Sequence, residues 1–240
     1  MNEHLLERRL NQVGAQLLSF SCRESLAQAL CDDLQMSLNA ALEIRGEASL
    51  VLPGGSTPER LLELLSVCGL DWSRLTVTLS DERWVSTDSA DSNEWQLRRQ
   101  LLRGAAAEAR FVPLNLAAGS VEEAAELAGQ ALAALPRFDC VVLGMGGDGH
   151  CASLFPDSPE LAQAMAMRSR RACVALTTPA SPYPRLTLTL PRLLNSEHVV
   201  VYICGEEKRH VLERALFADP APPVAALFGR GTPVSVYWAP

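Results

Sequence analysis

Leucines spaced four residues apart predict a long amphipathic helix in the first part of the chain. They recur from Leu26 to Leu42, so they would share one face of a helix. Ser21 with Glu24 three residues later is a capping-box pattern that predicts its start, and Gly46 predicts its end. Further helices are expected over residues 60–65, 94–103 (closed by Gly104), 120–135 and 208–216.

Short apolar runs between these helices predict strands. They cover residues 48–52, 75–79, 138–143, 173–176, 186–190, 198–204 and 234–238, the last as an edge strand. Because strands and helices alternate, we expect a mostly parallel sheet with helices on both faces. Ligands of such sheets bind beyond the carboxyl ends of the strands, so the loops that follow strands are the places to look for a site.

Composition narrows the class of protein. A length of 240 residues suits one α/β domain over 1–240. The net charge of −7 and the lack of a basic stripe argue against nucleic-acid binding. Seven cysteines, an odd number without a C-x-x-C pair, indicate a reduced protein. The charged N-terminus lacks a signal core, and no apolar run is long enough to span a membrane, so a cytoplasmic location is expected.

The first polar loop after a strand is Gly54-Gly55-Ser56-Thr57. Two glycines before a helix let backbone N–H groups approach an anion, and the two hydroxyls and the helix dipole would add to a phosphate site. The alternative is a tight turn in which Thr57 caps a helix that begins at Pro58.

A second polar loop, residues 80–85, follows the strand at 75–79. The planar guanidinium of Arg83 suits a phosphate, and Asp81 suits sugar hydroxyls. The alternative is a solvated ion pair between Arg83 and a neighbouring carboxylate.

The loop at 144–150 carries the most chemistry. Its glycines, Gly144-x-Gly146-x-x-Gly149, match the spacing of a dinucleotide-binding turn. We reject that interpretation because the strand at 173–176 ends without a ribose-binding acid, and because Asp148 would lie beside the pyrophosphate.

The same loop presents Asp148 and His150 together. A carboxylate can hold a histidine in one tautomer for use as a general base. An Asp-x-His pair could also be half of a metal site, but the other histidines, at 4, 198 and 210, form no second ligand cluster by spacing. We therefore expect neither a metal nor an organic cofactor.

Two positive residues are weaker candidates for an anion site. Lys208 is the only lysine beside 20 arginines, so it marks a place where a compact ammonium is wanted, or simply a helix surface. Arg185 stands just before the apolar run at 186–190.

Taken together, these segments resemble the 6-phosphogluconolactonase family, which belongs with the glucosamine-6-phosphate deaminases. The resemblance runs in order through PGGSTP (53–58), SDERWV (80–85), DSN (91–93), LGMGGDGHCASLFP (143–156), RLTLTLP (185–191) and CGEEK (204–208). It implies a Rossmann-like three-layer α/β fold and no cofactor. It implies that His150 is the general base, with Asp148 beside it and Asp81 as a further acid near the sugar. It also implies phosphate contacts from Gly55, Ser56, Thr57, Arg83, Arg185 and Lys208.

One departure separates the two branches of this family. The deaminases follow the shared D-G-H with a segment whose Glu works with the His, and Phe155 stands at that position here. Phe cannot move a proton, so we expect a lactonase that hydrolyses 6-phosphogluconolactone with a water activated by His150. The alternatives are a deaminase-like isomerase and an inactive phosphosugar-sensing protein. The expected partner is the small phosphosugar alone, without nucleic acid or membrane, and the chain is expected as a monomer or small homo-oligomer.

Overall fold

Seven parallel strands form the central sheet of the structure, a computed structural model that describes residues 5–240. Their order across the sheet is β1-β10-β9-β6-β2-β3-β5, and each neighbouring pair is parallel. The strands are β1 (Ala15–Ser19), β2 (Ala48–Leu52), β3 (Leu75–Leu79), β5 (Arg110–Val112), β6 (Phe138–Leu143), β9 (Ser196–Cys204) and β10 (Val234–Ala239). The predicted α/β class with a mostly parallel sheet is confirmed.

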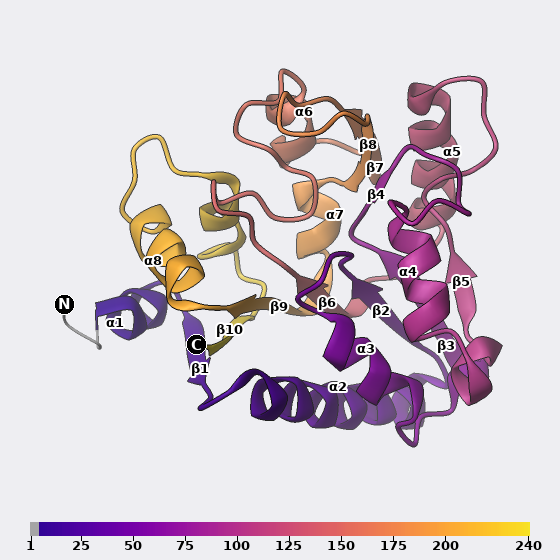
Figure 1. The fold of residues 1–240 in the computed structure, drawn as a ribbon, viewed down its shortest axis with the longest axis horizontal. Helices are drawn as coiled ribbons and strands as arrows, with labels where there is room; N and C mark the ends of the chain where they lie inside the picture. The colour runs from indigo at the N-terminus through magenta and orange to yellow at the C-terminus, as the bar shows by residue number, and fades with distance from the viewer. Residues whose placement is uncertain (1–4) are drawn as a thin grey trace.

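Helices cover both faces of this sheet (Figure 1). In that view α2 runs along the lower side with α3 above it, and α7 lies on the upper side. The α-helices are α1 (Leu5–Gln12), α2 (Arg23–Arg45), α3 (Glu59–Ser66), α4 (Asn93–Gln100), α5 (Val121–Ala133), α6 (Leu161–Met165), α7 (Leu190–Leu194) and α8 (Glu206–Ala215). Short 3₁₀ turns are η1 (Trp72–Arg74), η2 (Gly104–Glu108) and η3 (Pro223–Leu227). The leucine stripe of α2 is buried from Leu26 to Leu42, as its spacing predicts.

A second, antiparallel sheet lies beside the first and was not anticipated. Its order is β4-β8-β7, with β4 (Asp81–Arg83), β8 (Arg185–Leu188) and β7 (Cys173–Leu176). The expected loop at 80–85 is therefore wrong in part, since its residues 81–83 form a strand. Three residues are too few to show a hydrophobic period, and only pairing with β8 makes this segment a strand.

Missing one strand, β1, led to a second error in the strand assignment. β10 was expected at an edge, but it lies between β1 and β9 with all six residues buried. The strand that takes the edge, β1, was missed. Its burial alternates only weakly, so its short sequence has no clear strand pattern.

Helix ends differ from expectation where side chains compete for the cap. Cys22 rather than Ser21 caps α2, in a reciprocal capping box with Ser25, because Glu24 instead binds Arg60. Pro58 precedes α3 without a side-chain cap, so Thr57 is not its cap. α4 ends at Gln100, and Gly104 begins η2 instead of closing α4. The end predicted at Gly46 is confirmed, and Ser120 caps α5 by accepting the Glu123 N–H at 3.2 Å.

The direction in which successive strands are added to the sheet reverses between β2 and β6. From β2 the order runs outward through β3 to β5, and from β6 it runs the other way through β9 to β10. Such a switch point leaves a crevice between the loops that follow the two strands. These are the loops at 53–58 and 144–150, so the topology brings two of the predicted site segments together. Within residues 5–240, no helix has both the length and the apolar character needed to cross a membrane.

Candidate active site

A cavity of about 190 Å³ opens at this switch point. The loops after β2 and β6 form two of its walls, and the small sheet with β4 and β8 forms a third. It is lined by Pro53, Gly54, Gly55, Ser56, Thr57, Pro58, Asp81, Arg83, Asn93, Gly144, Met145, Gly146, His150, Ala152, Arg185 and Tyr202. Segments far apart in the sequence therefore converge on one volume that suits a small polar ligand.

His150 lies at the cavity wall with one ring nitrogen already bound. Its Nδ1 is 2.6 Å from Asp148 Oδ1, and the same oxygen accepts the His150 backbone N–H at 3.1 Å. A proton on Nδ1 leaves Nε2 with a lone pair for proton transfer. Asp148 lies outside the cavity lining, so it holds the ring in place instead of facing a ligand.

Gly146 allows this arrangement. A Cβ at position 146 would lie 2.1 Å from His150 Nδ1 and 2.6 Å from Asp148 Oδ1, which no side chain permits. The loop is also closed by a hydrogen bond from the Gly146 N–H to the His150 carbonyl at 2.8 Å. Gly146 thus makes room for the histidine–aspartate pair.

Arg83 and Arg185 stand directly opposite each other on the antiparallel strands β4 and β8. Like charges in that relation repel, so the pair is unfavourable unless an anion lies between them. Arg83 donates to the Asp91 carbonyl at 2.6 Å. Arg185 is 8% exposed, and its Nε and Nη1 have no hydrogen-bond partner within the described chain. Burial lowers the pKa of Arg185, against the opposing attraction of Asp81.

The Gly55–Thr57 loop lines the cavity, but its first N–H is already used. Gly55 donates to Gln96 Oε1 at 2.9 Å, and the Gly55 carbonyl accepts from Gln96 Nε2 at 2.5 Å. The exposed Ser56 and Thr57 are thus the residues of this loop that remain for a ligand. Gln96 showed no signal in the sequence, because a glutamine inside a helix is ordinary.

Asn93 and Tyr202 also line the cavity, although neither was predicted as a site residue. Asn93 Nδ2 donates to the Asp81 carbonyl at 2.9 Å, and a Cβ at Gly54 would overlap the Asn93 amide at 2.1 Å. Tyr202 is the one residue with a polar tip in the apolar run of β9, which is a usable signal. Burial raises the pKa of its hydroxyl.

Lys208 is the predicted phosphate-binding residue that the structure leaves outside the cavity lining. It lies in the first turn of α8, where its Nζ would be 3.9 Å from a Cβ at Gly147. It therefore lies beside Gly147 of the 144–150 loop.

Glu82 is a buried acid with a structural task. Its carboxylate accepts from the backbone N–H groups of Arg83, Asn93 and Glu94 at 2.6–2.7 Å, and from Ser92 Oγ at 2.9 Å. Burial raises its pKa although each of these bonds lowers it. Glu82 thereby joins β4 to the start of α4 and fixes the strand that carries Arg83.

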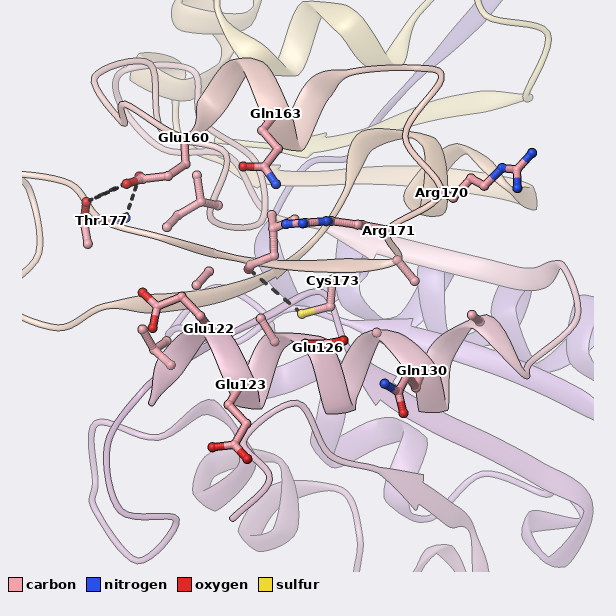
Figure 2. Close-up of a pocket in the computed structure, with 18 residues that line it drawn as sticks. Glu122, Glu123, Glu126, Gln130, Glu160, Gln163, Arg170, Arg171, Cys173 and Thr177 are labelled. Carbon is pink, nitrogen blue, oxygen red and sulfur yellow. Dashed lines mark hydrogen bonds between the residues drawn. The ribbon is translucent and has the colours of Figure 1, made fainter. Parts of the chain in front are cut away.

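A larger cavity of about 740 Å³ lies between α5 and β7 (Figure 2). Arg171 points across it, whereas Arg170 and Glu123 point away. Its thiol belongs to Cys173, whose pKa burial raises to about 12, which disfavours the thiolate. Glu160 is already bound by the Thr177 backbone N–H at 3.1 Å. This cavity is lined by none of the predicted site residues. Within residues 5–240, no group of three His, Cys, Asp or Glu side chains is arranged to bind a metal ion.

The fold and the cavity define an α/β protein with a histidine–aspartate pair and an arginine pair beyond the carboxyl ends of its parallel strands. The chain belongs to the family described as glucosamine-6-phosphate isomerases/6-phosphogluconolactonase, whose model matches residues 21–238.

Relatives in this family are similar over nearly their whole length. A 6-phosphogluconolactonase of Pseudomonas aeruginosa is 42% identical, with 95% of each chain covered, and one of Pseudomonas putida is 42% identical, with 90% of each covered. The crystal structure of a 6-phosphogluconolactonase from Shewanella baltica superposes with a TM-score of 0.90 at 41% identity, covering 93% of this chain and 97% of that one. A monomeric glucosamine-6-phosphate deaminase shares the fold, with a TM-score of 0.75 at 21% identity.

Proposed function

We propose that this chain hydrolyses 6-phospho-D-glucono-1,5-lactone to 6-phosphogluconate, a step of the oxidative pentose phosphate pathway. The observation that carries the proposal is the meeting, in one cavity, of a histidine held through Nδ1 and two opposed arginines. The first group suits proton transfer, and the second suits a phosphate. The 6-phosphogluconolactonases among the relatives supply the choice of substrate.

The reaction needs one base and no covalent intermediate. His150 Nε2 takes a proton from water while the water oxygen attacks the lactone carbonyl. The bond between the carbonyl carbon and the ring oxygen then breaks, and the histidine returns its proton to that oxygen. Asp148 stabilises the imidazolium that exists between the two steps, because its carboxylate already binds Nδ1 at 2.6 Å.

The phosphate end of the substrate fixes the position of the carbonyl. Arg83 and Arg185 bind the phosphate, with the hydroxyls of Ser56 and Thr57 beside them. A bound dianion compensates the buried charge of Arg185 and relieves its repulsion with Arg83. Binding energy from this distant group then holds the lactone against His150.

We place this activity in the cytoplasm and assign it no nucleic-acid partner. All seven cysteines, which lie within the described residues, are free thiols, as a reducing compartment maintains them. The net charge of −7 opposes binding to a polyanion.

The test is the rate of 6-phosphogluconolactone hydrolysis with the spontaneous rate subtracted. Activity above background, with much weaker activity on unphosphorylated gluconolactone, is the expected result. Equal efficiency on the two lactones would overturn the assignment. Ammonia release from glucosamine-6-phosphate would point instead to the deaminase branch, which Phe155 disfavours because it has no group to move a proton.

A further inference from the structure

Asp81 lines the cavity, yet both of its carboxylate oxygens are already bound. Ser80 Oγ donates to Oδ1 at 2.8 Å, and Ser153 Oγ donates to Oδ2 at 2.5 Å. Asp81 is 7% exposed, and both serines are completely buried. A carboxylate held in this way is oriented by its neighbours and has little freedom to exchange protons with a substrate.

The bond to Ser153 connects two parts of the site that are 72 residues apart in sequence. Asp81 begins β4, the strand that carries Arg83, and Ser153 lies three residues after His150. Ser153 is held a second time, because its N–H donates to Thr187 Oγ1 at 3.2 Å. Thr187 is the residue opposite Asp81 on β8. Two adjacent strands of the small sheet, β4 and β8, therefore both bind Ser153 and hold the loop that carries His150.

The segment that carries Ser153, residues 151–155, is a tight turn under backbone strain. Cys151 and Leu154 form an isolated antiparallel bridge, and Ala152 between them has a φ of +48°. A residue with a Cβ rarely adopts this conformation, and it persists only where surrounding contacts impose it. The two bonds to Ser153 are such contacts, and Ala152 faces the cavity as a result.

The turn leads directly to the histidine ring. Phe155 N–H donates to the Ser153 carbonyl at 3.0 Å, and the Phe155 ring packs on the His150 imidazole with centroids 4.3 Å apart. The guanidinium of Arg185 lies over the same phenyl ring, 5.5 Å from its centroid. Displacing Ser153 would therefore move the surface on which the imidazole rests.

We propose that Asp81 is a positioning residue, which acts through its hydrogen bond to Ser153 to hold the 151–155 turn and thereby set the place of the His150 imidazole relative to the arginine pair. This role rests on the proposed function and adds to it. Asp81 carries no proton in the reaction. Its contribution is to geometry, and a displacement of about 1 Å at such a site costs on the order of 100-fold in rate.

The experiment compares Ser153→Ala, Asp81→Ala and the double variant, measuring kcat and KM for 6-phosphogluconolactone well below the melting temperature of each protein. We expect kcat to fall about 10- to 100-fold in both single variants. KM should stay within about threefold, because Arg83 is held separately by Asp91 and by the Glu82 bonds to α4. The double variant should be no worse than the poorer single variant, since both substitutions break the same contact.

Ser49→Ala is the matched control. Ser49 Oγ donates to Asp139 Oδ2 at 3.1 Å, in a buried serine–aspartate pair at the amino ends of β2 and β6. Its loss should lower the melting temperature and leave kcat unchanged. The same pattern in Ser153→Ala would mean a merely structural role and would overturn the proposal.

Two further outcomes also count against it. A large loss in Asp81→Ala with wild-type kcat in Ser153→Ala would mean that Asp81 acts on the substrate directly and not through Ser153, and additive losses would mean that the two residues act independently. If Ser153→Ala does not fold, Thr187→Val breaks the bond to the Ser153 N–H, together with the bond from Thr187 Oγ1 to the Leu188 carbonyl, and should lower kcat in the same direction by a smaller factor. A parent protein without lactonase activity would refute the proposed function itself, whereas an active parent with unaffected variants would refute only this inference.

Discussion

Buried charges are surrounded differently at the two ends of the central strands. We call the side where the parallel strands begin the amino edge, and the side where they end the carboxyl edge. At the amino edge, Asp139 of β6 is 7% exposed and all its neighbours complement it. It accepts the Ser49 N–H at 2.7 Å and the Ser49 hydroxyl at 3.1 Å, and it pairs with Arg45. At the carboxyl edge, Arg185 is equally buried, but two of its three guanidinium nitrogens have no partner within residues 5–240, and it faces Arg83.

This difference separates a structural charge from a functional one. A buried carboxylate with three partners joins α2, β2 and β6, and it gains nothing from a ligand. A buried cation that faces a second cation is unfavourable by itself and improves when an anion binds. The edge with unsatisfied groups is therefore where we expect substitutions to change activity, and the satisfied edge is where we expect them to change stability.

The largest effect should come from His150 at the carboxyl edge. Replacement by Ala or Asn should lower kcat by roughly 10²- to 10⁴-fold, the usual contribution of a general base, with little change in melting temperature. His210→Asn is the control, because that histidine is exposed on α8. Rates are measured as lactone hydrolysis above background, and a variant at position 150 that keeps the parent rate would contradict the mechanism.

Arg185→Met should give the next largest effect. A charged hydrogen bond to the phosphate is worth about 1.5–3 kcal/mol, so kcat/KM should fall about 10- to 100-fold, mostly through KM. The free energy of unfolding should change by less than about 1 kcal/mol, since removing the charge also removes its desolvation cost.

The control for Arg185 is Arg168→Met, which removes an exposed arginine outside the cavity. Inorganic phosphate should compete with the substrate in the parent and compete less in Arg185→Met. Unchanged competition would show that the phosphate binds elsewhere.

Asp139→Ala tests the other edge and should give the reverse result. It leaves the buried Ser49 N–H and hydroxyl without an acceptor, which costs about 1–3 kcal/mol of unfolding free energy. The kcat of the folded protein should not change. Denaturant unfolding gives the first quantity and lactone hydrolysis the second. Asp71→Ala, which breaks an exposed pair with Arg74, should alter neither appreciably. A fall in kcat in Asp139→Ala would mean that the two edges are coupled.

Local sequence features were enough to predict the main elements of this fold. The leucine period of α2 and the apolar runs of β2, β3, β6 and β9 are strong signals, because each element buries its apolar residues against the same core. The glycine-rich loop at 144–150 was informative for a similar reason. Its residues are neighbours in sequence, so their spacing already indicates that Asp148 and His150 lie together.

Contacts between distant segments could not be predicted in this way. The strand β4 exists only because it pairs with β8, about 100 residues later. The β4–β8 register places Arg83 opposite Arg185. It also places Asp81 opposite Thr187, so that both can accept hydrogen bonds from Ser153. Cap choices failed for a local version of the same reason, since Glu24 was taken from its expected capping box by Arg60 on α3.

Lys208 gives the smallest effect, and it sharpens the comparison at the carboxyl edge itself. As the only lysine in the chain it was a candidate for the phosphate site, but the structure places it beside Gly147 and outside the cavity lining. A half-exposed ammonium acting through solvent contributes about 0.2–1 kcal/mol. Lys208→Ala should therefore reduce kcat/KM by no more than about fivefold, and this loss should shrink as salt is raised because long-range attraction is screened. Arg185→Met should keep most of its loss at high salt, since a buried contact is screened much less. Measuring both variants at low and high ionic strength separates the two cases. A loss in Lys208→Ala as large as that in Arg185→Met, and equally insensitive to salt, would mean that the α8 end closes onto the bound phosphate.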